Sequence, residues 1–393
     1  MGYKTYTCPI AKSCGGCETL AVPYPLQLQR KQRQVEELFA DLLASCDEGT
    51  LSPIVGMDQP VAYRNKAATP FAPGPKGSIR SGFFARGTHH IVRCRSCLVE
   101  DPRCRRVLNS FARTAELCHV SAYDEDKGRG LLRHAVVRAG WQTDELLLTI
   151  VANGERLPRE RELVGRIVKH APDVTAIALN TNTRRTNAIL GPTSRALYGG
   201  GTIRDELLGV TFEIGPTSFY QTNPSQTERL YRLAIEGAGL ERGMRVLDAY
   251  CGIGTIGLCA AAQVPGLQVT GVEVGQGAVA DARRNARING LRDRCQFFCA
   301  DATAFMRDLA GRGERMDVVI MDPPRAGSTP EFLSGVITLA PRQVVYVSCN
   351  PVTQRRDLEQ LLAGGYRLTS LTPVDMFPHT KHVETVCLLT HKG

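Results

Sequence analysis

The chain has 393 residues, of which 43% are hydrophobic and 22% are charged, and these values are ordinary for a soluble globular protein. Its length allows two or three domains, and no apolar run approaches the roughly 18 residues of a membrane-spanning helix. The start, MGYKTYTCPI, lacks the basic end and the apolar core of a signal peptide. We therefore expect a cytoplasmic protein that does not associate with membranes.

The net charge of +9 is concentrated in one segment of the chain. Between residues 60 and 110, ten Lys or Arg residues outnumber two acidic ones, and four aromatic residues lie among them. Cations and aromatic rings together suit a nucleic acid with unpaired bases, although a solvated surface above core aromatics is the alternative. The cations are Arg64, Lys66, Lys76, Arg80, Arg86, Arg93, Arg95, Arg103, Arg105 and Arg106, and the aromatic residues are Tyr63, Phe71, Phe83 and Phe84.

Cysteines cluster at two places in the amino-terminal half. Because disulfides are rare in a reducing compartment, clustered cysteines are interpreted first as metal ligands or reactive thiols. The C-x2-C pairs CGGC and CRSC fit zinc or iron–sulfur ligation, and the residues alone leave zinc, iron–sulfur and no metal all open. The cysteines in the clusters are Cys8, Cys14, Cys17, Cys94, Cys97 and Cys104.

The first predicted element after the cysteines is a helix over about 25–45. Its apolar residues recur at helical spacing, its first half is basic, and it can pack on the carboxyl-terminal domain. Short β-like segments follow from about 61 to 154 and from 176 to 219, separated by Gly, Pro and charged turns. Residues 1–214 are therefore predicted to form a mixed, mostly antiparallel α+β domain that binds RNA.

The pattern changes in residues 215–393. Helix-like SQTERLYRLAIEGAGL precedes strand-like MRVLDAY, and apolar strands then alternate with helical stretches through QVTGVEV, CQFFCAD, MDVVIMDPP and QVVYVSCNP. Apolar strands that alternate with helices indicate a parallel sheet covered on both faces. We expect an α/β, doubly wound, Rossmann-like domain that binds a nucleotide cofactor.

The segment VLDAYCGIGTIGL follows one of these strands and carries the spacing G-x-G-x-x-G, which begins with Gly252 and Gly254. With Glu273 nineteen residues beyond Gly254, the spacing also fits a dinucleotide site. Asp248 favours S-adenosylmethionine instead, because a carboxylate there can meet the methionine ammonium but would repel a pyrophosphate. Glu273 is then placed to accept the ribose hydroxyls, and Asp301 is a candidate for the adenine amine.

Two further strands end in reactive residues. Asp322 closes DVVIMD and Cys349 closes VVYVS, so both are expected in the crevice at the carboxyl edge of the sheet. A thiolate is the nucleophile that a pyrimidine needs, because carbon 5 attacks a methyl donor only after something adds to carbon 6. Removal of the carbon-5 proton then requires a base, and FPHTKHVETV offers Glu384 with His379 and His382 nearby.

With these residues in place, the sequence resembles the RNA uracil-5-methyltransferase family, whose members make 5-methyluridine in ribosomal and transfer RNA. The motifs CGGC, YRNK, GFF, LRHAVVR, SFYQTN, DAYCGIG, MDPPR, YVSCNP and HTKHVETV carry the resemblance across nearly the whole chain. It implies methyl transfer from S-adenosylmethionine to a specific uridine of RNA, with 23S ribosomal RNA as the first candidate and the T-loop uridine of tRNA as the alternative. A dinucleotide-dependent oxidoreductase with a reactive cysteine and a catalytically silent RNA-binding protein are the competing classes.

The resemblance also implies roles for individual residues. Cys349 is the implied nucleophile and Glu384 the base, with Asp322 near both the donor and the target base. Thr255 departs from the family pattern, since several members carry Asn there. The implied donor contacts are Gln221, Tyr250, Thr255, Glu273, Asp301 and Asp322.

The same resemblance implies a four-iron four-sulfur cluster. Its implied ligands are Cys8, Cys14 and Cys17 with the distant Cys97, whereas Cys94 points elsewhere. Many family members begin with an extra small β-barrel that binds RNA, and here we expect the basic segment to bind RNA without it. We expect a monomer.

Overall fold

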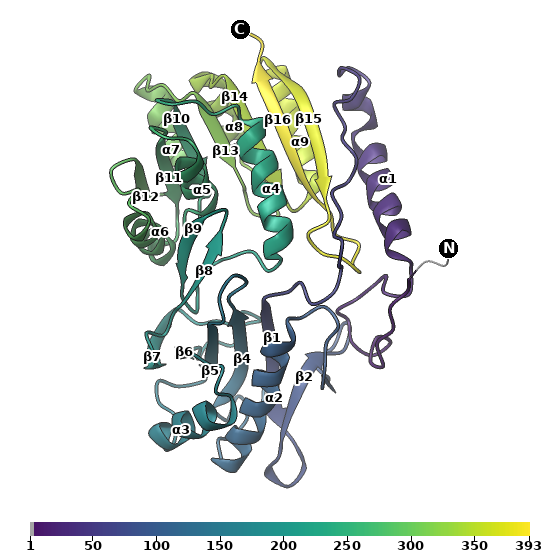
Figure 1. Ribbon diagram of the computed structural model, residues 1–393, viewed down its shortest axis with the longest axis vertical. Coiled ribbons are helices and arrows are strands. Elements are labelled where there is room, and N and C mark those ends of the chain that lie inside the picture. Colours follow the sequence, from purple (N-terminus) through teal and green to yellow (C-terminus); the bar gives the residue numbers. More distant parts are fainter. Residues whose placement is uncertain (1–3) are drawn as a thin grey trace.

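The computed structural model of the protein describes residues 4–393, which form two seven-stranded sheets and one two-stranded sheet. The large sheets lie at opposite ends of the molecule, with the two-stranded sheet between them (Figure 1). Among these residues no helix combines the length and the apolar character needed to cross a bilayer. A mostly antiparallel sheet is thus followed by a mostly parallel one, and the predicted fold class is confirmed.

The first sheet contains β1 (Lys66–Pro73), β2 (Ile79–Phe84), β3 (Ile91–Arg93), β4 (Leu132–Ala139), β5 (Leu146–Ala152), β6 (Ala176–Thr181) and β7 (Thr193–Tyr198). The order is β3-β2-β1-β4-β5-β6-β7, and only β5 and β6 pair in parallel among these strands. Two helices, α2 (Pro102–Leu117) and α3 (Glu160–His170), share a core with it. Neither helix is among the predicted elements, which are strands in this part of the chain.

The second sheet contains β10 (Arg245–Ala249), β11 (Gln268–Glu273), β12 (Cys295–Cys299), β13 (Val318–Met321), β14 (Gln343–Ser348), β15 (Tyr366–Val374) and β16 (Glu384–His391). Five of these strands, in the order β12-β11-β10-β13-β14, are parallel. The last two form an antiparallel hairpin, and β16 pairs with β14. This return strand places Thr385 opposite Ser348, so Glu384 and Cys349 flank that pair.

Helices cover both faces of the second sheet, as the apolar strands require. They are α1 (Tyr24–Leu43), α4 (Pro224–Gly237), α5 (Thr255–Gln263), α6 (Gln276–Ile288), α7 (Ala302–Gly311), α8 (Pro330–Leu339) and α9 (Pro351–Ala363). Successive strand residues point to opposite faces, so Val246 joins the core of α4, α5 and α6, whereas Leu247 joins that of α1, α7, α8 and α9. Helix α1, drawn in purple, therefore lies beside the β15–β16 hairpin although it begins the chain (Figure 1).

The two-stranded sheet connects the two large ones. It consists of β8 (Ile203–Leu207) and β9 (Val210–Ile214), and Phe212 and Ile214 are fully buried. They share one core with Leu147 of the first sheet and Val246 of the second. Because a single apolar core spans this junction, the first sheet is held against the side of the molecule where the parallel strands end.

Candidate active site

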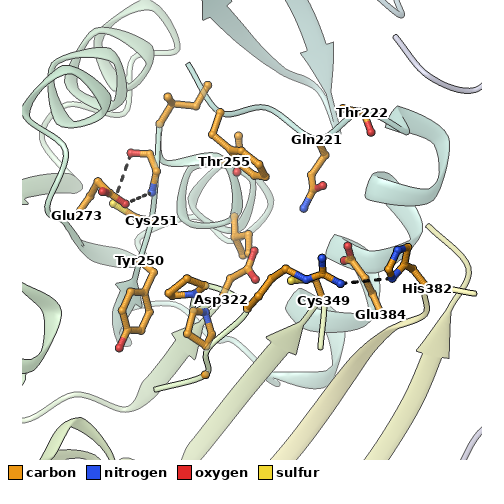
Figure 2. Close-up of a pocket in the computed structure, with 18 of the residues that line it drawn as sticks. Gln221, Thr222, Tyr250, Cys251, Thr255, Glu273, Asp322, Cys349, His382 and Glu384 are labelled. Carbon is orange, nitrogen blue, oxygen red and sulfur yellow. Dashed lines mark hydrogen bonds between the residues drawn. The ribbon is translucent and has the colours of Figure 1, made fainter. Parts of the chain in front are cut away.

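A cavity of about 1120 Å³ opens at the carboxyl ends of β10, β11, β13 and β14 (Figure 2). This is the edge at which open α/β sheets bind their ligands. The wall also includes Gly15, Gly16 and Arg64 of the amino-terminal half. Predicted site residues in the wall are Gln221, Asp248, Tyr250, Gly252, Thr255, Glu273, Asp301, Asp322, Cys349 and Glu384.

The glycine loop turns sharply between β10 and α5. Tyr250, Gly252 and Gly254 all have positive φ, at 62°, 54° and 81°, so the backbone leaves the strand and starts the helix within a few residues. Gly254 is not part of the cavity wall; a Cβ there would lie 2.9 Å from the Phe297 ring. Gly254 therefore shapes the loop, because its positive φ favours glycine and because a side chain at this position would collide with the Phe297 ring.

Asp248 holds the glycine loop in place through a hydrogen bond to the first turn of α5. It is 1% exposed, and its Oδ2 accepts the Gly257 N–H at 2.9 Å, which ties the first turn of α5 to the strand. A Cβ on Gly257 would lie 2.8 Å from that oxygen, so glycine is needed for the approach. Burial, with a smaller contribution from the nearby Asp322 and Glu273 carboxylates, raises the pKa of Asp248 to about 7, although the Gly257 hydrogen bond favours the ionised form.

The carboxylates at the two next strand ends are held in fixed orientations. Glu273 accepts the Gly252 N–H at 3.2 Å and the Gly275 N–H at 2.8 Å, so its carboxylate closes one side of the glycine loop. Asp301 caps α7 by accepting the Ala304 N–H at 2.9 Å. Figure 2 shows Glu273 and Tyr250 on one side of the cavity and Gln221 on the other.

The opposite part of the cavity brings Cys349, Asp322 and Glu384 together (Figure 2). Burial raises the pKa of Glu384 to about 8 and that of Asp322 to about 7. The pKa of the Cys349 thiol is raised by burial and by the Glu384 and Asp322 charges. Arg325 lowers the pKa of both Cys349 and Glu384, so this cation favours the ionised forms of the thiol and the carboxylate.

Arg325 is a residue that the sequence analysis missed, although it ends the motif MDPPR. It lines the cavity, and its Nη2 lies 3.3 Å from Nδ1 of His382, which lines the cavity as well. His379 does not. Its Nε2–H donates to the Pro60 carbonyl at 2.8 Å and its Nδ1 accepts from Gln27 at 3.1 Å, so both nitrogens are used inside the fold.

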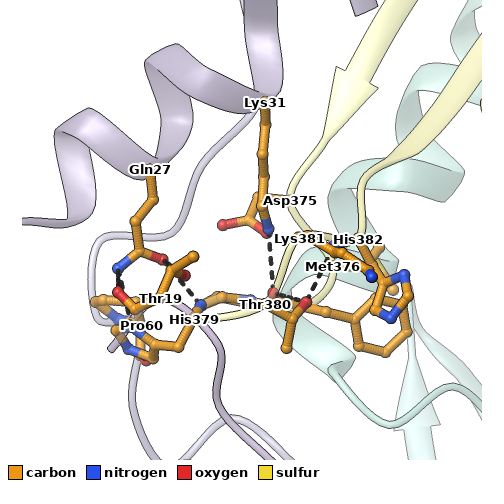
Figure 3. Close-up of polar contacts among 12 residues, drawn as sticks. Thr19, Gln27, Lys31, Pro60, Asp375, Met376, His379, Thr380, Lys381 and His382 are labelled. Atoms are coloured by element: carbon orange, nitrogen blue, oxygen red, sulfur yellow. Dashed lines mark hydrogen bonds and ion pairs between the residues drawn. The ribbon is translucent and has the colours of Figure 1, made fainter. Parts of the chain in front are cut away.

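The loop that leads to Glu384 is fastened to α1 (Figure 3). Lys31 donates to Asp375 at 2.6 Å and to the Phe377 carbonyl at 3.1 Å, and both side chains of this ion pair are buried. Gln27 accepts the His379 N–H at 3.0 Å, which helps to hold His379 at a φ of 67°. Polar residues of α1 thus position the loop from which Glu384 enters the cavity.

The cysteine segment is joined to the same loop. The N–H groups of Glu18 and Thr19 donate to the His379 carbonyl at 2.8 and 3.1 Å, directly after Cys17. Burial, followed by the charges of Cys97, Cys14 and Cys8, raises the pKa of Cys17 to about 12, so each of these three thiols is close enough to influence Cys17. The charges of Cys97 and Cys14 also raise the pKa of Cys94. Within residues 4–393 no three His, Cys, Asp or Glu side chains are arranged to hold a single metal ion.

Comparisons with known proteins agree with this geometry. Residues 207–392 match the family model described as tRNA (Uracil-5-)-methyltransferase. An uncharacterized RNA methyltransferase of Staphylococcus aureus is 42% identical over 98% of this chain and 84% of its own length. An uncharacterized RNA methyltransferase of Halalkalibacterium halodurans is 40% identical over 98% of this chain and 83% of its own length.

A solved structure covers almost the same length. The Pyrococcus abyssi tRNA (uracil-54, C5)-methyltransferase, in complex with S-adenosyl-L-homocysteine, superposes with a TM-score of 0.78 and 28% identity, over 98% of this chain and 87% of that one. S-adenosyl-L-homocysteine is what remains of S-adenosylmethionine after it gives up its methyl group, so the ligand of that complex agrees with the predicted methyl donor. The chain belongs to the RNA uracil-5-methyltransferase family and is an S-adenosylmethionine-dependent RNA (uracil-5-)-methyltransferase.

Proposed function

We propose that the protein methylates carbon 5 of one uridine through a covalent adduct between Cys349 and carbon 6. The observation that carries the proposal is the meeting of Cys349, Asp322 and Glu384 in one cavity with the residues proposed to bind the donor. These residues are Gln221, Asp248, Tyr250, Gly252, Thr255, Glu273, Asp301 and Asp322, with Gly254 shaping the loop. S-adenosylmethionine supplies the methyl group when it is bound there.

The chain's own residues account for the remaining steps. The Cys349 thiol loses its proton to solvent, and its sulfur bonds to carbon 6. The electron pair of the carbon 5–carbon 6 double bond then moves toward carbon 5, which takes the methyl group. Glu384 then removes the carbon-5 proton, and the electron pair left behind expels the Cys349 thiolate. Arg325 favours the ionised thiol and carboxylate, which are the forms that these steps require.

Two variants test the covalent mechanism with radiolabelled methyl donor and cellular RNA. Cys349→Ala should abolish methyl transfer, and a rate equal to wild type would refute the mechanism. Glu384→Gln should instead accumulate a protein–RNA adduct on a denaturing gel, because release lacks its base. Cys46→Ala, a half-buried thiol whose S–H donates to the Leu42 carbonyl, is the matched control and should keep wild-type activity.

The proposed substrate is a uridine of 23S ribosomal RNA, the first candidate that the family resemblance implies. The alternative is the T-loop uridine of tRNA, which is supported by the name of the archaeal enzyme and the description of the family model. Mapping 5-methyluridine in ribosomal and transfer RNA from cells with and without the gene separates the two. Loss of the modification from tRNA alone would overturn the ribosomal assignment.

We assign RNA binding to residues 1–214 and donor binding to residues 215–393. We also propose that the protein is a monomer. Size-exclusion chromatography with light scattering tests this, and a dimeric mass would contradict it.

We propose that the thiols of Cys8, Cys14, Cys17 and Cys97 would hold a four-iron four-sulfur cluster, and the influence of the other three on the pKa of Cys17 supports this set. Such a cluster would hold the chain start against the basic segment, since methyl transfer requires no electron. Iron and sulfide contents after anaerobic purification test it. Cys17→Ser should lose iron, Cys94→Ser should retain it, and zinc without iron in the wild type would overturn the assignment.

A further inference from the structure

A second hollow lies beside the catalytic cavity, on the β2–β3 hairpin. It has a volume of about 570 Å³, and its wall consists of residues 83–89 of the hairpin with residues 14–16 of the CGGC motif. We call it the hairpin groove. Gly15 and Gly16 also line the catalytic cavity, so the two hollows share one wall. Cys14 pairs with Ala85 as an isolated β-bridge, which fixes this wall to the hairpin.

The segment that carries the hairpin groove has an unbalanced positive charge, and one of its cations, Arg86, lines the groove itself. Residues 76–95 include five Lys or Arg and no Asp or Glu. All five side chains are exposed. Among residues 4–393, none of the five forms an ion pair. They are Lys76, Arg80, Arg86, Arg93 and Arg95. A partner with negative charge along its length, such as a phosphate backbone, complements this surface.

Of the four aromatic residues in the basic segment, only Phe84 is exposed. Tyr63 and Phe71 are buried, and Phe83 lies under the Arg105 guanidinium at 4.5 Å. Phe84 is 37% exposed and stacks on His89, with ring centroids 5.1 Å apart and planes at 26°. His89 is oriented by a 2.6 Å contact between its Nδ1 and the Glu125 carboxylate. The result is a braced aromatic stack at the surface.

We propose that the hairpin groove binds an unpaired nucleotide next to the target uridine. The base stacks on the Phe84–His89 pair, and Arg86 contacts the adjoining phosphate. Sequence-tolerant recognition of single-stranded RNA commonly combines aromatic stacking with a basic groove. The inference rests on the proposed entry of the target uridine into the catalytic cavity, because the two hollows share the Gly15–Gly16 wall and are therefore neighbours.

The test measures the affinity of the full-length protein for fluorescein-labelled dodecameric oligouridylate by fluorescence anisotropy. Phe84→Ala should weaken binding at least fivefold, the lower end for loss of one stacked base, and Phe84→Tyr should bind within twofold of wild type. The matched control is Tyr198→Ala, because Tyr198 is 41% exposed but lies on β7, at the opposite edge of the same sheet. It should leave the affinity unchanged.

A salt titration tests the phosphate contact separately. Arg86→Ala should reduce the slope of log Kd against log salt concentration by about 0.7, the value for one phosphate contact on a single strand. Arg161→Ala, an exposed cation on α3, should leave the slope unchanged.

Two results would overturn the inference: an affinity of Phe84→Ala within twofold of wild type, or an equal loss in Tyr198→Ala. If Phe84→Ala fails to bind S-adenosylhomocysteine as wild type does, Phe84→Leu, which keeps the bulk but removes the ring, decides in its place. The proposed covalent mechanism is assayed separately with Cys349→Ala. An active wild type with unchanged Phe84→Ala affinity contradicts the groove alone, whereas methyl transfer by Cys349→Ala contradicts the mechanism alone.

Discussion

Replacing Lys31 by methionine tests how the loop that carries Glu384 is held. Within residues 4–393, Lys31 is the only cation bonded to the Asp375 carboxylate, and Tyr24 is the only other side chain that donates to it, at 2.7 Å. The Lys31 and Asp375 side chains are 4% and 0% exposed. The substitution therefore leaves a buried carboxylate with a single hydroxyl partner.

The loss of stability should be large because water cannot reach the Asp375 carboxylate once Lys31 is replaced. Removal of one partner of a buried ion pair destabilises a protein by about 3–5 kcal/mol, whereas replacement of both by uncharged groups costs much less. The double variant Lys31→Met with Asp375→Asn keeps an acceptor for Tyr24 and removes both charges. We expect it to be more stable than Lys31→Met alone, although it carries one more substitution.

Hydrogen exchange of the amides in residues 375–384 measures this effect where it acts. Protection should fall in Lys31→Met and recover in the double variant, and methyl transfer should follow the same order because Glu384 follows this loop. Lys31→Met protection within about 1 kcal/mol of wild type would refute the role of the pair. A double variant as unprotected as the single one would show that the abandoned charge is not the cause.

Three further outcomes follow from the site. The value of kcat/KM should rise with pH up to about 8, because burial raises the pKa of the Glu384 carboxyl to about 8 and only its ionised form accepts a proton; a rate that falls over pH 6–8 would contradict this. Gly257→Ala should weaken S-adenosylhomocysteine binding in calorimetry, since the new Cβ meets Asp248 at 2.8 Å, whereas Gly277→Ala on α6, with open space around it, should not. S-adenosylhomocysteine should raise the melting temperature and NAD should not; the reverse would contradict the assigned donor.

Local patterns in the sequence were sufficient for the α/β fold class and the enzyme class. Glycines after an apolar strand, and Cys349 at the end of another, identify the cavity edge because parallel strands end at one side of a sheet. The helices α2 and α3 were missed for a local reason as well. Arg105 is 3% exposed in α2, where it pairs with the buried Glu100 at 2.8 Å, and periodicity treats such a charge as a surface position.

Other features depend on contacts between distant segments. The hairpin of β15 and β16 is antiparallel because the loop after Val374 returns the chain between β14 and β15, and a strand pattern does not reveal its direction. Arg325 became a member of the site only through its position beside Cys349 and Glu384. The three thiols that influence Cys17 are a similar case, and the iron–sulfur cluster itself stays a prediction.

By itself, the sequence determined the enzyme class, because the motifs at the strand ends, including the glycine loop, are local signals. Only the tertiary structure decided how that chemistry is positioned. Lys31 and Asp375 are 344 residues apart, yet their ion pair fixes the loop before Glu384. In the sequence, Phe84 cannot be told apart from the other aromatic residues of the basic segment. In the folded chain, it is the one that is neither buried nor covered by Arg105. Burial and long-range pairing are properties of the packed chain, and no local pattern encodes which residues they will select.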